Sequence, residues 1–315
     1  MPLEQGLFIE LQVNSMPDAL FINACDTNPL AIDPTEIINP DKELFNNALE
    51  SLKVLFSCPI HLTYQNSKFD TSIDGINYHS FVGPHPAGLS SVHISHIYPV
   101  NLKRVAWTIG FQDVISLGYL LKNKTIRTHK TIALAGPSVF DPSLISARIG
   151  GNLDELSAGK VKDNTRVISG SVLFGHSSEG VMTYLGNYDS LISAIPDESN
   201  DIFMNWLMPG KNLHSKLNIF ASSFFTPNEF VFNTSLNGGD RAIVPVGSYE
   251  EVLPMDILVT QLLKSLVISD LEVAVELGML ELAPEDLAVC SYICPSKYDY
   301  SSILLDNLNK LHLEQ

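Results

Sequence analysis

The stretch Cys290-Ser291-Tyr292-Ile293-Cys294-Pro295 matches the end of the bacterial iron–sulfur run C-x2-C-x2-C-x3-C-P. Counting back from Cys290 in steps of three, the next two ligand positions hold Leu287 and Pro284. Neither side chain supplies a thiolate, so a four-cysteine cluster cannot assemble from this run. The stretch indicates a relative of an electron-transfer protein that retains only two vestigial cluster cysteines, Cys290 and Cys294.

The composition indicates a globular chain of more than one domain. With 315 residues, the chain is too long for one compact core and fits two or three domains. A hydrophobic content of 45% with 17% charged residues is typical of folded domains and not of disorder. The other cysteines, Cys25 and Cys58, lie far upstream in apolar stretches, so we expect no disulfide framework and a reducing compartment.

The charge restricts the possible partners. A formal net charge of −16 opposes binding to nucleic acid and direct anchoring to anionic lipid. The longest apolar stretch, Ile257–Ile268, is interrupted by Gln261 and Lys264 and is too short to span a bilayer. Residues Met1–Ser15 contain neither a capped helix nor a clear strand, which suggests a fragment without its upstream domain.

Residues 1–128 are predicted to form an α/β domain, because strand and helix patterns alternate there. Strands are expected at Ala19–Ala24, Ile60–Tyr64, Tyr78–Val82 and Val105–Ile109. One helix is expected to begin at Pro40, with Asn39 as its N-cap. A second is expected to follow the turn Gly83–Gly88, and a third to span Gln112–Leu121. Alternation of this kind favours a parallel sheet covered by helices.

Residues 129–175 are predicted to form a small α+β unit of the β-grasp kind. Its strands are expected at Thr131–Ala135, around Ile145–Ile149 and at Arg166–Ser169. A short helix capped by Asn152 and ended by Gly159 separates the last two strands. Residues 176–250 are predicted to be β-rich, with an alternating strand at Phe230–Leu236 and a turn at Asn237–Asp240.

Residues 251–315 are predicted to form a helical bundle around the two cysteines. Asp256 is expected to start the first helix, and Ser269-x-x-Glu272 to cap a second that stops at Gly278. Pro284 lies in the first turn of a third helix. A fourth carries Leu304, Leu305, Leu308 and Leu311 on one stripe.

This order of units resembles the flavin-bearing, NADH-binding subunit of respiratory complex I. Six local motifs narrow the resemblance to the A-subunit family of the Na+-translocating NADH:quinone oxidoreductase. These are Ala24-Cys-Asp-Thr-Asn-Pro-Leu-Ala31, Gly83-Pro-His-Pro-Ala-Gly-Leu89, Trp107-Thr-Ile-Gly-Phe-Gln-Asp-Val-Ile115, Arg166-Val-Ile-Ser-Gly-Ser-Val-Leu173, Asn237-Gly-Gly-Asp-Arg241 and Cys290-x3-Cys-Pro-x-Lys-Tyr-x-Tyr300. The resemblance covers the chain from about Pro17 to its end, without the family's N-terminal segment.

The resemblance implies a Rossmann-like α/β domain, an SLBB-type β-grasp unit and a bundle without an iron–sulfur cluster. It further implies a peripheral subunit of a translocase at the cytoplasmic face of the bacterial inner membrane. That respiratory complex passes electrons from NADH to ubiquinone and exports Na+. Its FAD, FMN, riboflavin and iron–sulfur centre belong to other subunits, some of them integral to the membrane, so this chain is expected to hold no redox cofactor.

The turn between Gly83 and Gly88 corresponds by resemblance to a flavin-contacting loop. A glycine-rich turn before a helix can bind phosphate through its backbone N–H groups. Here Pro84 and Pro86 remove two of those donors, so a structural turn is favoured. No complete G-x-G-x-x-G follows a strand, so there is no dinucleotide fingerprint.

The sequence has one local cluster of residues that could bind a metal, the four histidines His79, His85, His93 and His96. No carboxylate or cysteine lies nearby at ligand spacing, so hydrogen-bonding histidines are favoured over a metal site. If an aromatic headgroup such as that of a quinone binds, His85 and Trp107 are the candidate neighbours. No Ser/His/Asp or Cys/His set indicates a catalytic residue.

Three functions remain open at this point. The chain is a subunit of a redox pump without its own redox centre, a cofactor-bearing flavin or iron–sulfur oxidoreductase subunit, or a free-standing soluble binding protein. The missing thiolates at Leu287 and Pro284 favour the first.

Overall fold

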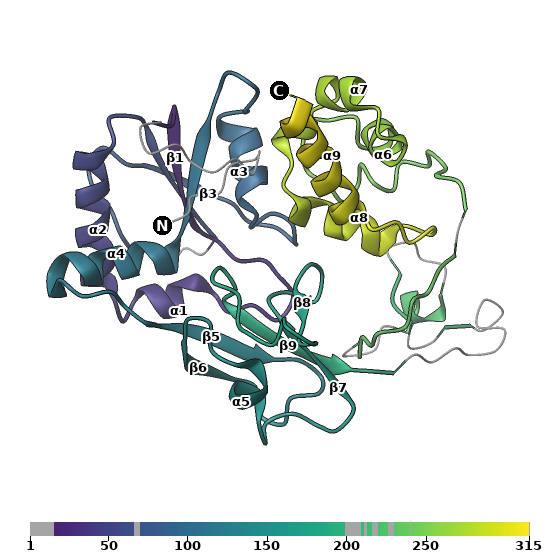
Figure 1. Ribbon diagram of the computed structural model, residues 1–315, viewed down its shortest axis with the longest axis horizontal. Helices are drawn as coiled ribbons and strands as arrows, with labels where there is room; N and C mark the ends of the chain where they lie inside the picture. The colour runs from purple at the N-terminus through teal and green to yellow at the C-terminus, as the bar shows by residue number, and fades with distance from the viewer. Residues whose placement is uncertain are drawn as a thin grey trace.

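The computed structural model describes residues 16–65, 70–198, 209–210, 213–215, 220–225, 230–239 and 241–314. These residues form a parallel sheet with covering helices, a second, mixed sheet and a C-terminal group of helices (Figure 1). The expectation for Met1–Ser15 lies outside the described residues. In the part of the chain that the structure describes, no helix has both the length and the apolar character needed to cross a bilayer.

The first sheet contains four strands in the order β3-β2-β1-β4, all parallel. Their bounds are β1 (Ala19–Ala24), β2 (Ile60–Tyr64), β3 (Asn77–Ser80) and β4 (Ala106–Gly110). The central strand β1 is apolar along nearly its whole length because helices cover both of its faces. The predicted parallel sheet is therefore confirmed, with strand ends shifted by one or two residues.

Helices cover the two faces of this sheet unequally. One face packs against α1 (Pro34–Ile38), α2 (Lys42–Leu55) and α4 (Phe111–Asn123). The other face packs against α3 (Ser90–Ile97). The helices α2 and α4 touch so closely that a Cβ at Gly118 would overlap the backbone carbonyl of Leu44.

The predicted start of the helix at Asn39 and Pro40 is wrong. Asp33 caps a separate short helix, α1, by accepting a hydrogen bond from the Thr35 amide at 2.9 Å. Asn39 ends that helix, and α2 begins two residues after Pro40, at Lys42. An N-cap residue followed by proline predicts a helix start at both Asp33-Pro34 and Asn39-Pro40. In the structure a helix starts at Asp33-Pro34 and none starts at Asn39-Pro40.

The second sheet has five strands in the order β6-β5-β9-β7-β8. They are β5 (His129–Ala135), β6 (Ser143–Arg148), β7 (Thr165–Ser169), β8 (His176–Ser177) and β9 (Leu191–Pro196). Asn152 caps α5 (Leu153–Ser157), as predicted. The buried central strand β9 lies beyond residue 175, so the sheet extends past the predicted end of the β-grasp unit.

The predicted β-rich character of residues 176–250 is wrong for most of the residues of that segment that the structure describes. Among these residues only β8 and β9 are strands, and the strand expected at Phe230–Leu236 does not form. The rings of Phe230 and Phe232 instead pack around His214, with centroids at 5.1 and 5.7 Å. The last residue of the predicted turn, Asp240, lies outside the described residues.

The C-terminal unit contains four α-helices and two 3-10 turns in its described residues. They are α6 (Val259–Ile268), α7 (Leu271–Glu276), η3 (Met279–Glu281), η4 (Pro284–Leu287), α8 (Ala288–Ile293) and α9 (Tyr300–Glu314). Two predicted starts are wrong. The helix α6 begins three residues after Asp256, and Asp270 rather than Ser269 caps α7 through the Val273 amide.

This C-terminal unit packs beside α3 of the first unit (Figure 1). Val92 of α3 belongs to the same buried cluster as Cys290 and Cys294. On α9 the side chains of Leu304 and Leu308 are buried, whereas Leu305 is exposed. The predicted leucine stripe is therefore narrower than expected, and the two cysteines lie in the core that it covers.

Candidate functional site

A cavity lies at the carboxyl edge of the first sheet. It has a volume of about 360 Å³ and is lined by the ends of β1 and β4 and by the first turn of α4. The chain passes from β1 to β2 on one side of β1 and returns to β4 on the other. The carboxyl edge at such a reversal of strand order is where open α/β sheets bind ligands.

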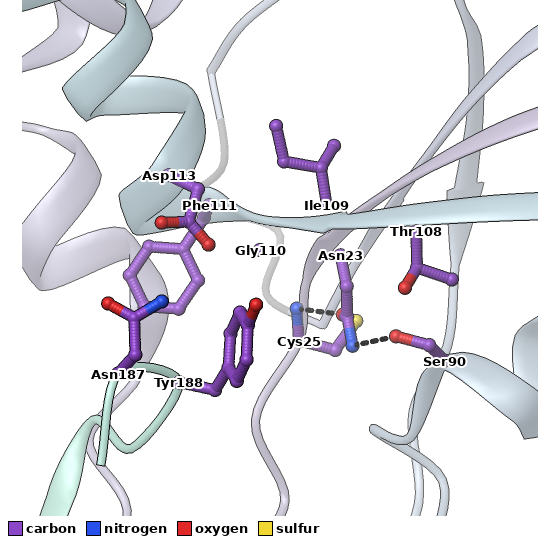
Figure 2. A pocket seen from close by; sticks show the side chains of 10 residues that line it. All are labelled: Asn23, Cys25, Ser90, Thr108, Ile109, Gly110, Phe111, Asp113, Asn187 and Tyr188. Carbon is purple, nitrogen blue, oxygen red and sulfur yellow. Dashed lines mark hydrogen bonds between the residues drawn. The ribbon is translucent and has the colours of Figure 1, made fainter. Parts of the chain in front are cut away.

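The walls of the cavity come from both sheets. Figure 2 shows Phe111, Asp113, Asn187 and Tyr188 on one side and Asn23, Ser90 and Thr108 on the other. Asn187 and Tyr188 belong to the loop before β9, so the second sheet closes a cavity that the first sheet opens. Two aromatic rings, one carboxyl group and several neutral polar groups therefore face the cavity.

The side chain of Asn23 makes hydrogen bonds at the wall of this cavity. Its amide nitrogen donates to the Gly88 carbonyl and to the Ser90 hydroxyl, both at 3.0 Å. Its amide oxygen accepts a hydrogen bond from the Cys25 backbone N–H at 2.8 Å. One side chain thus ties the end of β1 to the turn that precedes α3.

Two titratable groups lie beside the cavity, in a smaller hollow of about 80 Å³ that shares its walls. Burial raises the pKa of Asp113 above its ordinary value, and the nearby Lys130 charge offsets part of the effect. Burial lowers the pKa of Lys130 to about 8, against the attraction of Asp189 and Asp113. The Lys130 ammonium donates to the carbonyls of Gly186 and Asn187 at 3.1 and 2.8 Å, which fixes the loop that carries Tyr188.

The residues after β1 are buried and tied to the second sheet. Burial raises the pKa of the Cys25 thiol to about 12, so it is protonated at neutral pH. Asp26 accepts hydrogen bonds from the Asn28 amide at 3.0 Å and from the Ser190 hydroxyl at 3.3 Å. Burial nevertheless raises the pKa of this carboxyl. Cys25 and Asp26 therefore hold the junction rather than offering a nucleophile.

The Gly83–Gly88 turn uses its own backbone donors. The amides of Ala87, Gly88 and Leu89 donate to the Pro84 carbonyl, the Thr27 hydroxyl and the Pro86 carbonyl, in that order. A Cβ at Gly88 would lie 2.7 Å from the Thr27 nitrogen, so only glycine fits there. With these three amides occupied and none at Pro84 or Pro86, the turn does not fit a flavin phosphate.

The structure does not bring His85 and Trp107 together. His85 contacts Thr27 beyond the carboxyl end of β1, with Nδ1 and Oγ1 3.3 Å apart, and burial lowers its pKa to about 4. Trp107 pairs with Leu20 near the opposite end of β1 and packs edge-on against Phe56 at 5.9 Å. Neither side chain lines the cavity.

The predicted histidine cluster is divided between separate contacts. The rings of His93 and His96 lie 4.2 and 6.1 Å from the Phe81 ring, and His79 bonds to His61 with ring nitrogens 3.0 Å apart. The buried Nε2–H of His93 donates to the Ala87 carbonyl at 2.8 Å. Among the described residues, no three His, Cys, Asp or Glu side chains are placed to hold a metal ion.

The surroundings of the cysteine pair do not fit an iron–sulfur cluster. Cys290 and Cys294 are both fully buried and free. The hydroxyl of Tyr300 lies 3.5 Å from Cys294 Sγ and 3.2 Å from the hydroxyl of Tyr249. Burial raises the pKa of Cys290 to about 12. A four-cysteine cluster needs four thiolates, whereas this site has two thiols, and its other polar groups are phenols.

Sequence reasoning missed the residues that close the cavity. Asp113 lies inside the quoted Trp107–Ile115 motif, where an acidic residue in the first turn of a predicted helix was the available signal. Lys130 was a further signal, because it is a charged residue directly before the apolar run of β5. Its side chain is buried in the structure. No local pattern marked Asn187 or Tyr188, because they meet the first sheet only through the tertiary fold.

The fold and the cavity define a mixed α/β protein with a cavity at the edge of a parallel sheet and no complete set of cluster ligands among its described residues. Family models match it in two places, as "NqrA second alpha/beta domain" over residues 9–126 and as "NQRA C-terminal domain", an SLBB model, over residues 131–180. A chain of a solved NAD+-reducing [NiFe]-hydrogenase in the H2-reduced state has a TM-score of 0.42 at 11% identity, over 56% of this chain and 40% of that one.

Curated relatives extend the match to nearly the whole chain. The A-subunit of the Na(+)-translocating NADH-quinone reductase of Rhodopirellula baltica is 42% identical over 96% of this chain and 67% of its own length. The corresponding subunit of Pseudomonas aeruginosa is 43% identical over 99% of this chain and 72% of its own. The A-subunit of Hahella chejuensis is 42% identical over 96% of this chain and 68% of its own length. The chain belongs to the NqrA family, the A-subunits of the Na+-translocating NADH-quinone reductases.

Proposed function

We propose that this chain acts as a peripheral subunit of a Na+-translocating NADH-quinone reductase and holds no redox cofactor of its own. The observation that carries the proposal is the 42–43% identity to NqrA over at least 96% of the chain in three relatives. The other subunits, including integral membrane subunits, hold the FAD, FMN, riboflavin and iron–sulfur centre. They attach the chain to the cytoplasmic face of the bacterial inner membrane.

The described side chains support the lack of a redox centre. Positions 284 and 287, where cluster ligands are expected, hold Pro284 and Leu287. In the Gly83–Gly88 turn the amides of Ala87 and Gly88 are engaged within the protein, as is that of the following Leu89. The cavity wall carries the Asp113 carboxyl and otherwise neutral groups, a lining that opposes the phosphate of a flavin nucleotide. A cofactor-bearing oxidoreductase is therefore the weaker hypothesis.

The finer fold proposals follow the same family relationship. Residues 1–128 form a Rossmann-like domain, and residues from 129 onward an SLBB-type β-grasp unit that includes β9. The helices of residues 251–315 are related to the cluster-bearing bundle of the complex I flavin subunit. The buried pair Cys290 and Cys294, beside Tyr249 and Tyr300, supports this relation.

If the chain contributes to quinone access, the cavity at the sheet edge is a better place than His85 and Trp107. A quinone headgroup is flat, neutral and carries carbonyl acceptors. The rings of Phe111 and Tyr188 offer flat apolar faces, and the hydroxyls of Ser90 and Thr108 offer donors. Binding of a soluble ubiquinone analogue, with Tyr188→Ala as the matched variant, tests this part separately from assembly.

Assembly is the test of the proposed function. An affinity-tagged copy of the full chain is produced in a bacterium that makes the complex without its own NqrA, and membranes are extracted in mild detergent. We expect the remaining subunits to co-elute with the chain in fixed proportion. Tagged NqrA from Pseudomonas aeruginosa serves as the matched control. If that control recovers the complex and this chain elutes alone, the proposed function is wrong.

A further inference from the structure

Two histidines of the first sheet face each other across neighbouring strands. His61 lies on β2, and His79 lies on β3, the edge strand of that sheet (Figure 1). In the strand register His61 pairs with Asn77, so His79 lies two residues further along β3 and on the same face of the sheet. Neither histidine lines the cavity at the sheet edge, and the proposed function gives neither a role.

The ring nitrogens of this pair lie close together. Nδ1 of His61 is 3.0 Å from Nε2 of His79, and the two ring centroids are 5.2 Å apart with the ring planes at 32°. One of these nitrogens carries the hydrogen of the contact, and the other supplies a lone pair. Two atoms that can both bind a metal ion therefore converge at one point of the sheet.

The surrounding structure holds the His61 ring in place. This ring stacks on Phe21 of β1, with centroids 4.9 Å apart and planes at 18°. Phe21 is itself buried in the small apolar cluster beneath α3. Both histidines are only partly buried, so an ion can reach them from solvent. Ligands carried by strands are also positioned more precisely than ligands carried by loops.

The distance between the two nitrogens indicates which ion fits. Bonds from a metal ion to imidazole nitrogen are about 2.0–2.1 Å long, so two such bonds at about 90° place their nitrogens about 2.9 Å apart. A tetrahedral angle would place the nitrogens about 3.3 Å apart. The observed 3.0 Å is closer to two neighbouring corners of a square-planar or tetragonal ion. Among divalent first-row ions Cu2+ prefers that geometry and binds nitrogen ligands most tightly.

The chemistry around the pair agrees with such an ion. Imidazole nitrogens suit Cu2+, Ni2+ and Zn2+, whereas Ca2+ and Mg2+ require oxygen ligands. Burial and the facing His79 ring lower the pKa of His61, which favours the neutral form that binds metal. Among the described residues no third His, Cys, Asp or Glu side chain is placed to close the site, so water has access to it. The net charge of −16 attracts cations to the protein surface.

We propose that His61 and His79 form an open, two-histidine site for a divalent transition-metal ion, with Cu2+ as the ion that fits best. On binding, the hydrogen between the rings moves to the outer nitrogen of the ring that carries it, and both facing nitrogens bind the ion. Water fills the other coordination positions, and the ion ties the edge strand β3 to β2. The site is assigned no redox role, and this inference is independent of the proposed function because it concerns this chain alone.

Titration of the metal-free full chain with Cu2+, measured by calorimetry at neutral pH, tests the site. His61→Ala, His79→Ala and the double variant are compared with the control His129→Ala/His176→Ala, which removes two exposed imidazoles from the second sheet. We expect each single variant to bind Cu2+ at least about tenfold more weakly, and the control to differ by less than about twofold. Because the two rings bind one ion together, the double variant should bind hardly more weakly than either single variant.

Electron paramagnetic resonance tests the ligands directly. With one equivalent of Cu2+ we expect two coordinated imidazole nitrogens in the unmodified chain and fewer in each single variant. Ni2+ and Zn2+, titrated in the same way, should bind more weakly than Cu2+, and Mg2+ should not bind. Circular dichroism verifies that each variant folds. If His61→Ala does not fold, His61→Phe replaces it, because a phenyl ring can keep the stack on Phe21 and cannot bind the ion.

Several outcomes would overturn this inference. They are no binding of Cu2+ by the unmodified chain, unchanged affinity in both single variants, equal weakening in the control, or a spectrum without two imidazole nitrogens. A lower thermal unfolding midpoint in the single variants, with Cu2+ binding unchanged, would show that the pair is only a hydrogen bond between strands. Each of these results leaves the proposed function intact, because assembly with other subunits is measured separately.

Discussion

The hydroxyl of Ser91 on α3 donates a hydrogen bond to the carboxyl group of Asp286, 195 residues later in the chain. Asp286 is fully buried and also accepts a hydrogen bond from the Ala283 amide at 2.7 Å. One turn further along α3, the Ser95 hydroxyl donates to Glu281 at 3.2 Å. Two serine–carboxyl pairs thus join the first unit to the C-terminal unit beside the apolar contact of Val92.

Replacement of Asp286 is expected to change how stability depends on pH. Burial raises the pKa of this carboxyl from its ordinary 3.8 to about 7, although the hydrogen bonds from Ser91 and Ala283 oppose the shift. The stabilising contribution is therefore complete below pH 3.8 and is lost as the pH rises through about 7. In Asp286→Asn the amide oxygen can accept the Ala283 hydrogen bond and the amide nitrogen can donate to the Ser91 hydroxyl, so both contacts have a partner and the titration is removed.

Urea unfolding at pH 5 and pH 8 measures this effect. We expect the free energy of unfolding of Asp286→Asn, relative to the unmodified chain, to rise by about 2–4 kcal/mol between the two pH values. Glu281→Gln serves as the control and should show a smaller change, because Glu281 is only partly buried. The same difference at both pH values would show that Asp286 does not titrate in this range.

Gly118→Ala is expected to destabilise the first unit, although alanine is the better helix former. Helix propensity alone favours alanine by about 1 kcal/mol. The added methyl group would, however, overlap the Leu44 carbonyl of α2, and such overpacking costs about 1–3 kcal/mol. Gly239→Ala is the control, because a Cβ there meets nothing within 4 Å. A thermal unfolding midpoint that does not fall for Gly118→Ala contradicts the close contact of α2 with α4.

Replacing the cysteine pair is expected to reduce stability and little else. Cys290→Ser buries a hydroxyl without an identified acceptor, at a cost of about 1–3 kcal/mol. Cys294→Ser should cost less, because the Tyr300 hydroxyl lies beside that position. Cys58→Ser, at a half-buried site, is the control. Loss of electron transfer in a fully assembled complex that contains the double variant would restore a redox role for the pair.

The first sheet could be predicted from the sequence because its signals are local. The strands β1 and β4 are short apolar runs bounded by turn residues, and the longer helices α2 and α4 show their own periodicity. The start of α2 could not be fixed, because Asp33-Pro34 and Asn39-Pro40 are equivalent signals. The strand expected at Phe230–Leu236 failed because alternation cannot tell whether a neighbouring strand exists.

The candidate site was predicted less well than the fold. Residue identities alone show that the run around Cys290 and Cys294 has too few thiolates for a cluster, so that argument needs no tertiary structure. The cavity could not be found in this way, because Tyr188 and Asp113 line it together only when the second sheet packs on the first. The sequence does not show that His85 and Trp107 lie apart, because they are separated along β1 only in the folded sheet, with Trp107 beside Leu20 and His85 beyond the other end of that strand.

Attachment to the complex is expected to depend on salt. The net charge of −16 favours a basic partner surface, and salt screens the attraction between exposed charges. In flotation with vesicles that contain the partner subunits, raising the salt from about 0.05 M to about 0.5 M should release part of the bound chain. Vesicles of anionic lipid alone should bind none at either concentration. Attachment that is unchanged by salt would argue for a wholly apolar interface.

The cofactor content of the purified full chain tests the central claim most directly. The chain has too few thiolates for a four-cysteine cluster at 284–294, and in the Gly83–Gly88 turn the Ala87 and Gly88 amides are engaged and Pro84 and Pro86 have none. We therefore predict less than stoichiometric iron and acid-labile sulfide, and no flavin absorption after gel filtration. Iron and sulfide in stoichiometric amounts, or a flavin band that remains with the protein, would contradict the account of a subunit without its own redox centre.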